Sequence, residues 1–163
     1  MVVLRCTQRL LFRLKRFDDD PDARSTTRLG DWYGNLLRVG HRHALLFIAQ
    51  RSRLPVLLPV RAADRLATAL PAAVADALTA IGIPAQAIKQ ERAQMSPLRF
   101  GRTHSRSLLG SLTEFTRLAW FDFMTRRDVP LDVIARELAE VPLTLPFKGE
   151  HAAEVTRRLF GVE

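Results

Sequence analysis

The chain has 163 residues, of which 47% are hydrophobic and 26% are charged, and its formal net charge is +8. This composition argues against disorder and suffices for one domain with a sizeable core, so we expect a single domain over residues 1–163. No apolar run approaches the ~18 residues that a membrane-spanning helix needs. Cys6 is the only cysteine, so no internal disulfide can form, which fits a reducing cytoplasm. We therefore expect a cytoplasmic protein with no membrane partner.

The positive charge is uneven along the chain. Residues 1–65 carry 13 Lys and Arg against 6 Asp and Glu, whereas residues 66–163 carry 12 against 11. Such asymmetry can mark a face for nucleic acid or another polyanion. Arginine outnumbers lysine 22 to 3, however, and a GC-rich genome produces this bias without selection for binding. Charge alone leaves both explanations open.

The N-terminal segment predicts a strand followed by a short helix. Val2–Cys6 is an apolar, β-branched run, and Thr7 offers an N-cap hydroxyl. Leucines then recur at helical spacing as far as Phe17, with arginines and a lysine on the opposite side. One face of this helix should pack on the core and leave a basic face in solvent. The alternative, an Arg-rich transit peptide, is less favoured.

Three short apolar runs at Trp32–Val39, Ala44–Ala49 and Leu54–Val60 predict an antiparallel meander, because the loops between them are short. The middle run is apolar on both faces and should be central. The third carries two prolines, which lack the N–H needed for ladder bonds, so it should be an edge strand. Alternation in the first run places Trp32 on one face and Tyr33 on the other.

The second half of the chain predicts helices with one further short strand. Pro71 cannot sit inside a helix without loss, so we expect one helix to end before it and another to begin there. Ser111 and Glu114 have the spacing of a capping box, which places a helix N-terminus at Ser111. The expected helices cover residues 62–69, 71–81 and 84–94, then start at Ser111, Pro130 and Ala152, and the strand lies near Leu98–Thr103. The fold class is therefore α+β, with a small antiparallel sheet (a three-strand meander over residues 32–60 plus the N-terminal strand) packed against several helices.

The sequence contains no familiar catalytic, metal-binding or cofactor-binding motif. The acidic run 18–22 lacks the glycine and the distal Glu of a calcium loop. His41 and His43 flank Arg42, which repels a cation. We therefore expect no catalytic residue, no cofactor and no metal.

The first candidate ligand-binding stretch consists of Arg28, Asp31, Trp32, Tyr33 and Asn35. Aromatic faces beside a guanidinium group suit base stacking or a planar ligand. The alternative is structural: the aromatic rings fill the core, Asp31 caps a turn and Asn35 satisfies backbone groups.

The second candidate stretch combines arginines with hydroxyl groups ahead of a helix N-terminus. Free backbone N–H groups, the positive end of a helix dipole and nearby arginines together favour an anion. The alternative is an ordinary arginine-bearing surface loop. The residues proposed for this anion site are Arg99, Arg102, Thr103, Arg106, Ser107 and Ser111.

Three sequence blocks, RCTQRLL, TTRLGDWYGNLL and RSLLGSLTEF, resemble an uncharacterised bacterial domain family with RCTQKLL, LGDWYANLL and RSVLGSMNDF in the same order. ELAEVPLTLP and the terminal RRLFG extend the resemblance over nearly the whole chain. Gly34 stands where the family has Ala, and Leu112, Thr113 and Glu114 stand where it has Met, Asn and Asp. The resemblance implies a bacterial, cytoplasmic single domain without an assigned activity.

Three functional hypotheses follow. The first is a non-enzymatic binding domain that contacts nucleic acid, a phosphate-bearing ligand or another anionic partner through an arginine-rich face. The second is a protein-interaction module or a homodimer. The third is an enzyme of unknown reaction on an anionic substrate, with Asp31 or His104 as acid or base, which requires Asp31 to lie near Arg102 or Arg106.

Overall fold

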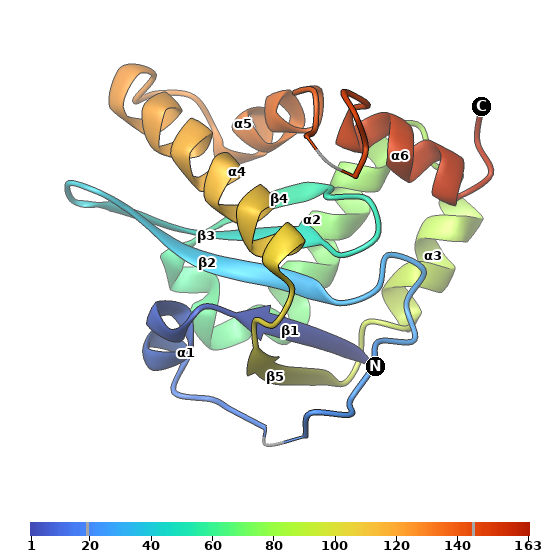
Figure 1. Cartoon of the computed structure of the whole chain (residues 1–163), viewed down its shortest axis with the longest axis horizontal. Helices are drawn as coiled ribbons and strands as arrows, with labels where there is room; N and C mark the ends of the chain where they lie inside the picture. The colour runs from blue at the N-terminus through green and yellow to red at the C-terminus, as the bar shows by residue number, and fades with distance from the viewer. Residues whose placement is uncertain (19, 145) are drawn as a thin grey trace.

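One open, mixed β-sheet forms the centre of the protein. The computed structural model describes residues 1–18, 20–144 and 146–163, and the strands lie in the order β4-β3-β2-β1-β5 (Figure 1). Strands β2, β3 and β4 form the expected antiparallel meander, but β1 is parallel to both of its neighbours, β2 and β5. The strands are β1 (Val2–Cys6), β2 (Trp32–Val39), β3 (Arg42–Ala49), β4 (Pro55–Pro59) and β5 (Leu98–Arg102).

The α+β prediction is confirmed, with one correction to the sheet. The expected sheet was antiparallel, whereas the structure joins β1 to β2 through a helical crossover, and such crossovers produce parallel pairs. β3 lies inside the sheet as expected, and Ala44–Ala49 is at most 1% exposed. β4 is an edge strand as its prolines indicated.

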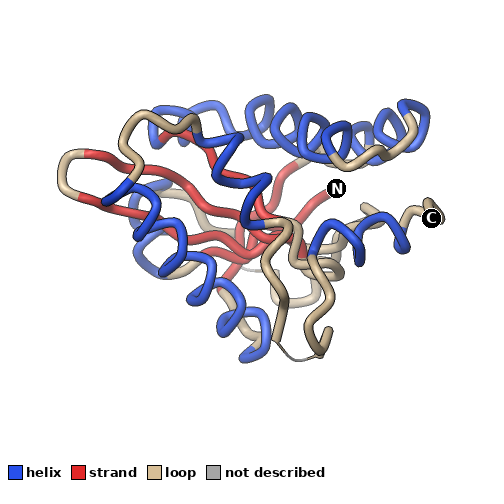
Figure 2. Tube along the Cα trace, turned by 90° about the horizontal axis from the view of Figure 1, so that it is seen from above, coloured by secondary structure: helices blue, strands red, loops and turns tan. Residues whose placement is uncertain are grey.

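Helices cover both faces of the sheet, as Figure 2 shows. α1 and α2 pack on one face, and α4 and α5 pack on the other. A 3₁₀ helix at Val60–Arg65 leads from β4 into α2. The α-helices are α1 (Gln8–Leu14), α2 (Leu66–Ala80), α3 (Ala85–Ala93), α4 (Arg106–Thr125), α5 (Leu131–Leu138) and α6 (Ala152–Leu159).

Two hydrophobic cores result from the alternation of side chains along β2. Trp32 and Leu36 belong to the core beneath α1 and α2, whereas Tyr33 and Leu37 belong to the core beneath α4 and α5. This confirms the predicted faces of β2. Consecutive residues of one strand therefore anchor opposite layers of the protein.

The expected helix break at Pro71 is wrong, because α2 runs through it. A proline inside a helix loses the bond to the carbonyl four residues earlier, at a cost of roughly 3 kcal/mol. Leu66, Leu70, Val74 and Leu78 form one buried stripe on both sides of Pro71, so packing on the sheet holds the two halves in line. Tertiary burial outweighs the local penalty here.

Helix α1 ends earlier than expected. Thr7 caps its N-terminus, since the Thr7 hydroxyl accepts a hydrogen bond from the Leu10 amide at 3.4 Å. Lys15 adopts a left-handed conformation with φ of 54°, which stops the helix at Leu14. Phe17 therefore lies outside the helix and is 48% exposed.

Gly34 of β2 lies where Leu10 of α1 packs closely on the sheet. A methyl group at this position would lie 2.5 Å from a ring carbon of Phe47 and 2.9 Å from Leu10. We expect Gly34→Ala to lower the free energy of unfolding by about 1–3 kcal/mol through overpacking. Chemical denaturation measures this, and Gly34→Ala combined with Phe47→Leu should lose less than the sum of the single changes. An additive double variant would contradict the proposed clash.

Candidate functional site

Asp31 forms a buried ion pair with Arg5. The Arg5 Nε lies 3.0 Å from the Asp31 Oδ2, and both residues are 3% exposed. The other carboxylate oxygen accepts hydrogen bonds from the Ser25 hydroxyl at 2.7 Å and the Ser25 amide at 3.2 Å. Arg5 also donates to the Ala23 carbonyl at 2.8 Å. Both oxygens of Asp31 are thus satisfied within the fold, which favours the structural interpretation of this residue.

The remaining residues of the first candidate stretch point in different directions. Trp32 is fully buried on the α2 side, and Tyr33 is fully buried on the α4 side. Asn35 accepts a hydrogen bond from Thr7 at 2.9 Å and donates to Thr116 of α4 at 3.3 Å. The Arg28 guanidinium lies 5.2 Å from the Phe160 ring, next to α6. The stretch does not form a single ligand-binding surface.

The second candidate stretch begins its helix earlier than expected. Ser105, not Ser111, is the N-cap of α4, and its hydroxyl accepts a hydrogen bond from the Leu108 amide at 3.3 Å. Ser107 and Ser111 lie inside the helix, where both hydroxyls accept hydrogen bonds from Arg53, each at 3.1 Å. The prediction of a helix start at Ser111 is wrong, because the apolar stripe already begins at Leu108.

The arginines of this stretch have separate surroundings. Arg99 pairs with Asp18 at 3.7 Å, and Arg102 lies over the Phe17 ring at 5.2 Å. Arg106 is exposed in the first turn of α4, and Thr103 is half-buried ahead of it. Anion binding by these residues stays a prediction.

The structure does not bring Asp31 and Arg102 together. Arg102 is level with Cys6 and Gly34 across the parallel strands, whereas Asp31 precedes the start of β2. Asp31 and Arg102 are thus offset by three residues along the strands and by two strands across the sheet. This offset separates their Cα atoms by roughly 14 Å. The branch of the enzymatic hypothesis that joins Asp31 to Arg102 therefore finds no support, and Asp31 is already bound to Arg5. An approach of Asp31 to Arg106, and a role for His104, stay predictions.

Basic and aromatic side chains also form a surface around α1, a helix that lies outside both candidate stretches. Phe12 is 84% exposed, and it lines two adjoining hollows together with Gln8. Among the residues that the structure describes, no acidic side chain lines either hollow. The alternation of arginines with Phe12 along a short helix was the signal in the sequence. We call this surface the α1 face, and its members are Arg9, Phe12, Arg13, Lys15, Phe17, Arg38 and Arg102.

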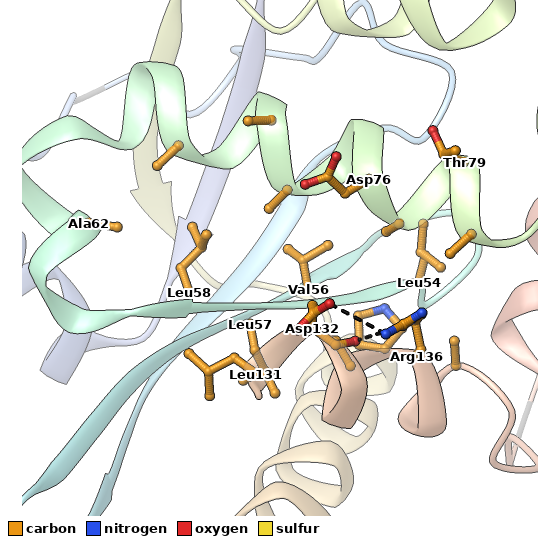
Figure 3. Close-up of a pocket in the computed structure, with 18 of the residues that line it drawn as sticks. Leu54, Val56, Leu57, Leu58, Ala62, Asp76, Thr79, Leu131, Asp132 and Arg136 are labelled. Carbon is orange, nitrogen blue, oxygen red and sulfur yellow. Dashed lines mark hydrogen bonds and ion pairs between the residues drawn. The ribbon is translucent and has the colours of Figure 1, made fainter. Parts of the chain in front are cut away.

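A further hollow, a groove of about 610 Å³, lies between β4, α2 and α5 (Figure 3). Alanines of α2 and the apolar side chains of β4 form much of its wall. At its rim Asp132 pairs with Arg136 at 3.4 Å, as the dashed lines in Figure 3 show. Arg65 and Asp76 also line the groove, but most of its lining residues are apolar, so it offers space mainly for apolar groups.

The outer side of α4 carries the third unusual surface. Trp120, Phe121 and Met124 are 44%, 61% and 50% exposed, respectively. They lie within two turns of one helix, whereas the buried stripe of α4 faces the sheet. We call these three residues the α4 patch.

Neither a cluster of metal ligands nor a helix able to span a membrane is found among the described residues. Residues 1–18, 20–144 and 146–163 contain no group of three or more His, Cys, Asp or Glu that could hold a metal ion. Asp19, part of the acidic run, lies outside the described residues. No helix in the described part of the chain is long and apolar enough to cross a membrane.

The fold and surface define an α+β domain with a structural ion pair at its centre and a basic, aromatic outer face. A family model for a domain of unknown function, DUF6933, matches residues 3–153, and the chain belongs to this family. The expected membership of an uncharacterised domain family is therefore confirmed. Comparisons with curated proteins and with solved structures found no match.

The Arg5–Asp31 pair yields a stability prediction. We expect Asp31→Leu to lower the free energy of unfolding by about 3–5 kcal/mol, because it leaves the Arg5 guanidinium buried without its partner. Chemical denaturation checks this. The double variant Arg5→Met with Asp31→Leu should be more stable than Asp31→Leu alone, since both charges are then removed.

Arg117→Ala provides the matched control for this prediction. Arg117 pairs with Glu114 at 2.7 Å on the surface, where its side chain is 66% exposed. Its removal should leave the free energy of unfolding unchanged, because solvent screens the pair. Equal losses for the Asp31 and Arg117 variants would contradict a structural role specific to the buried pair.

Proposed function

We propose that this protein is a non-enzymatic, bacterial, cytoplasmic domain that binds single-stranded nucleic acid through the α1 face. The observation that carries the proposal is the exposure of Phe12 in the midst of cationic side chains, with no acidic residue among the described residues that line the adjoining hollows. Exposed aromatic rings are costly in water, and stacking on bases is one of the ways in which proteins use them.

The charge around Phe12 complements a phosphate backbone. Arg9 and Lys15 are exposed and Arg13 is half-buried on α1, and exposed Arg38 of β2 lines the same hollow. Arg102 extends the positive charge toward β5, over the ring of Phe17. Cations that follow a groove together with stackable rings are typical of sequence-tolerant binding to single strands.

The surroundings of the α1 face do not favour a chemical reaction on the bound nucleic acid. Cys6 lies beneath the α1 face but is 1% exposed, and burial raises the pKa of its thiol far above the ordinary value, so it stays protonated. A buried, protonated cysteine in a chain with no second cysteine also agrees with a reducing cytoplasm. The side chains of the α1 face are therefore suited to binding alone.

Fluorescence anisotropy with a labelled oligothymidylate tests this proposal. We expect the slope of log affinity against log salt to be about −0.7 per contacted phosphate, and Arg13→Ala to reduce that slope by one such step. Phe12→Ala should weaken binding by about 1–3 kcal/mol, or roughly 5- to 150-fold in Kd, through lost stacking.

Two variants on the far side of the protein serve as controls. Phe121→Ala removes another exposed ring, from α4, and Arg127→Ala removes an exposed cation near the C-terminal end of that helix. Neither change should alter the affinity. Absence of binding at low salt would contradict the proposal. So would equal binding to a base-free polyanion with no effect of Phe12→Ala, which indicates a general polyanion site.

A second candidate function, self-association, has its own observation in the α4 patch. Three large apolar side chains are exposed on one helix, and such clusters in soluble proteins often mark contacts with a partner. A second copy of the chain can cover the patch with the same patch, which closes as a symmetric dimer. The buried stripe of α4 packs toward the sheet, whereas the α4 patch is exposed on the same helix.

Light scattering coupled to size-exclusion chromatography tests self-association. We expect a dimer at micromolar concentration, and a monomer when Trp120 and Phe121 are both replaced by Ser. Phe12→Ser removes the most exposed aromatic ring of the α1 face and should leave the dimer intact. A monomer for the unsubstituted chain would rule this candidate out.

A further inference from the structure

The N-terminus of α4 has a serine cap but leaves part of its backbone N–H groups free. α4 has 20 residues, and no acidic side chain lies in its first turn. Ser105 caps the Leu108 amide, but the amides of Arg106 and Ser107 have no hydrogen-bond acceptor in the part of the chain that the structure describes. Free N–H groups and the positive end of a helix dipole both attract an anion.

A buried hydroxyl group is directed at this helix end. Tyr33 is 0% exposed, and its hydroxyl has no hydrogen-bond partner among the described residues. The backbone N–H groups of His104 and Ser105 act on that hydroxyl, which places it next to the α4 N-terminus. Burial is the main cause that raises the pKa of Tyr33, so the hydroxyl is a proton donor at neutral pH. An unmade hydrogen bond on a buried donor is costly and calls for an acceptor.

A buried guanidinium group lies along the same two turns of the helix. Arg53 is 5% exposed and binds the hydroxyls of Ser107 and Ser111 and the Gln50 carbonyl, and its charge also acts on Tyr33. These three bonds use three of the five N–H groups of a guanidinium. The carboxylate that acts on Tyr33, Asp31, is already paired with Arg5. The Tyr33 hydroxyl therefore lies near one carboxylate, which is already paired, and near the charges of Arg5 and Arg53.

We propose that the N-terminus of α4 binds one phosphate-sized oxyanion, which accepts hydrogen bonds from the Tyr33 hydroxyl and from the Arg106 and Ser107 amides, with Arg53 as the nearby positive charge. A phosphate-sized oxyanion presents several acceptor oxygens, so it matches a site built from hydrogen-bond donors. The ligand is either a free phosphate or a terminal phosphate group of a larger molecule.

The His104 side chain lies beside this site. Its ring centroid lies 6.1 Å from that of Tyr33 in an edge-on arrangement, and the residue is exposed in the short loop between β5 and α4. The proposal requires the side chains around the buried Tyr33 hydroxyl to move apart when the anion binds, and exposed His104 is the neighbour that is free to do so. The site is separate from the α1 face, so the two proposals can be tested independently.

The experiment uses Tyr33 as its own probe, because it is the only tyrosine in the chain. The protein is labelled with isotope-enriched tyrosine, and the ring signal is followed by NMR while inorganic phosphate is added at constant ionic strength, with chloride as the reference salt. We expect a saturable shift with phosphate and none with chloride. Tyr33→Phe should weaken phosphate binding, measured by calorimetry, roughly tenfold or more.

A matched pair of cap variants separates binding from folding. Ser105→Asp keeps a good N-cap but places a negative charge at the helix end, so phosphate binding should be lost while thermal stability is kept. Ser105→Asn is the neutral cap of similar shape and should retain binding. Phe12→Ala should leave the phosphate response unchanged, since it lies on the α1 face.

Two results would overturn the proposal. One is an NMR shift of Tyr33 that rises linearly with the added salt and does not saturate. The other is an equal affinity for phosphate in the unsubstituted protein, Tyr33→Phe and Ser105→Asp. Oligonucleotides with and without a 5′-phosphate identify the source of the anion: a Tyr33 shift seen with the phosphorylated strand alone assigns the site to terminal phosphates, and a shift with inorganic phosphate alone assigns it to the free ion.

Discussion

The buried guanidinium group of Arg5 is the constraint around which the sheet is arranged. Arg5 lies in β1, the strand that joins the parallel part of the sheet, between Tyr33 of β2 and Gly101 of β5. A side chain at Gly101 would approach an Arg5 nitrogen to 2.8 Å, so the glycine gives the guanidinium its space. Through Asp31 and the Ala23 carbonyl, Arg5 also holds the long segment between α1 and β2 against the sheet. A charge in the interior thus connects three parts of the chain that local sequence does not relate.

Because contacts between distant parts of the chain determine the sheet, the sequence predicted local elements better than their pairing. The meander and its central strand were predictable, because Ala44–Ala49 is apolar on both faces and the prolines of β4 mark an edge. The parallel pairing of β1 with β5 joins residues more than 90 positions apart, and no local pattern encodes it. Pro71 misled the helix prediction, since the buried stripe that holds α2 together acts only in the folded protein.

The candidate site residues show the same limit. Both predicted stretches contain residues that contact α4, yet the arginines that matter most inside the fold are Arg5 and Arg53, which neither stretch included. A buried and an exposed arginine have the same appearance in a sequence. Ser105, Ser107 and Ser111 were equally good caps by type, and only the position of Leu108 in the buried stripe selects Ser105. The prediction of an anion near α4 stays open, with a different set of donors from the one the sequence indicated.

Both free edges of the open sheet are protected against addition of a further strand. At one edge, Pro55 and Pro59 have no N–H to offer, so Leu57 is the one outward donor that β4 can present. At the other edge, Asp18 occupies the middle of β5: its carboxylate accepts the Phe100 amide at 2.8 Å, and its own amide donates to the Phe100 carbonyl at 2.8 Å. An open five-stranded sheet is a template for edge-to-edge aggregation and strand exchange unless its edges are blocked. These blocked edges leave little of the sheet backbone free to pair with a strand from another chain, so contacts with a partner are expected to form through side chains.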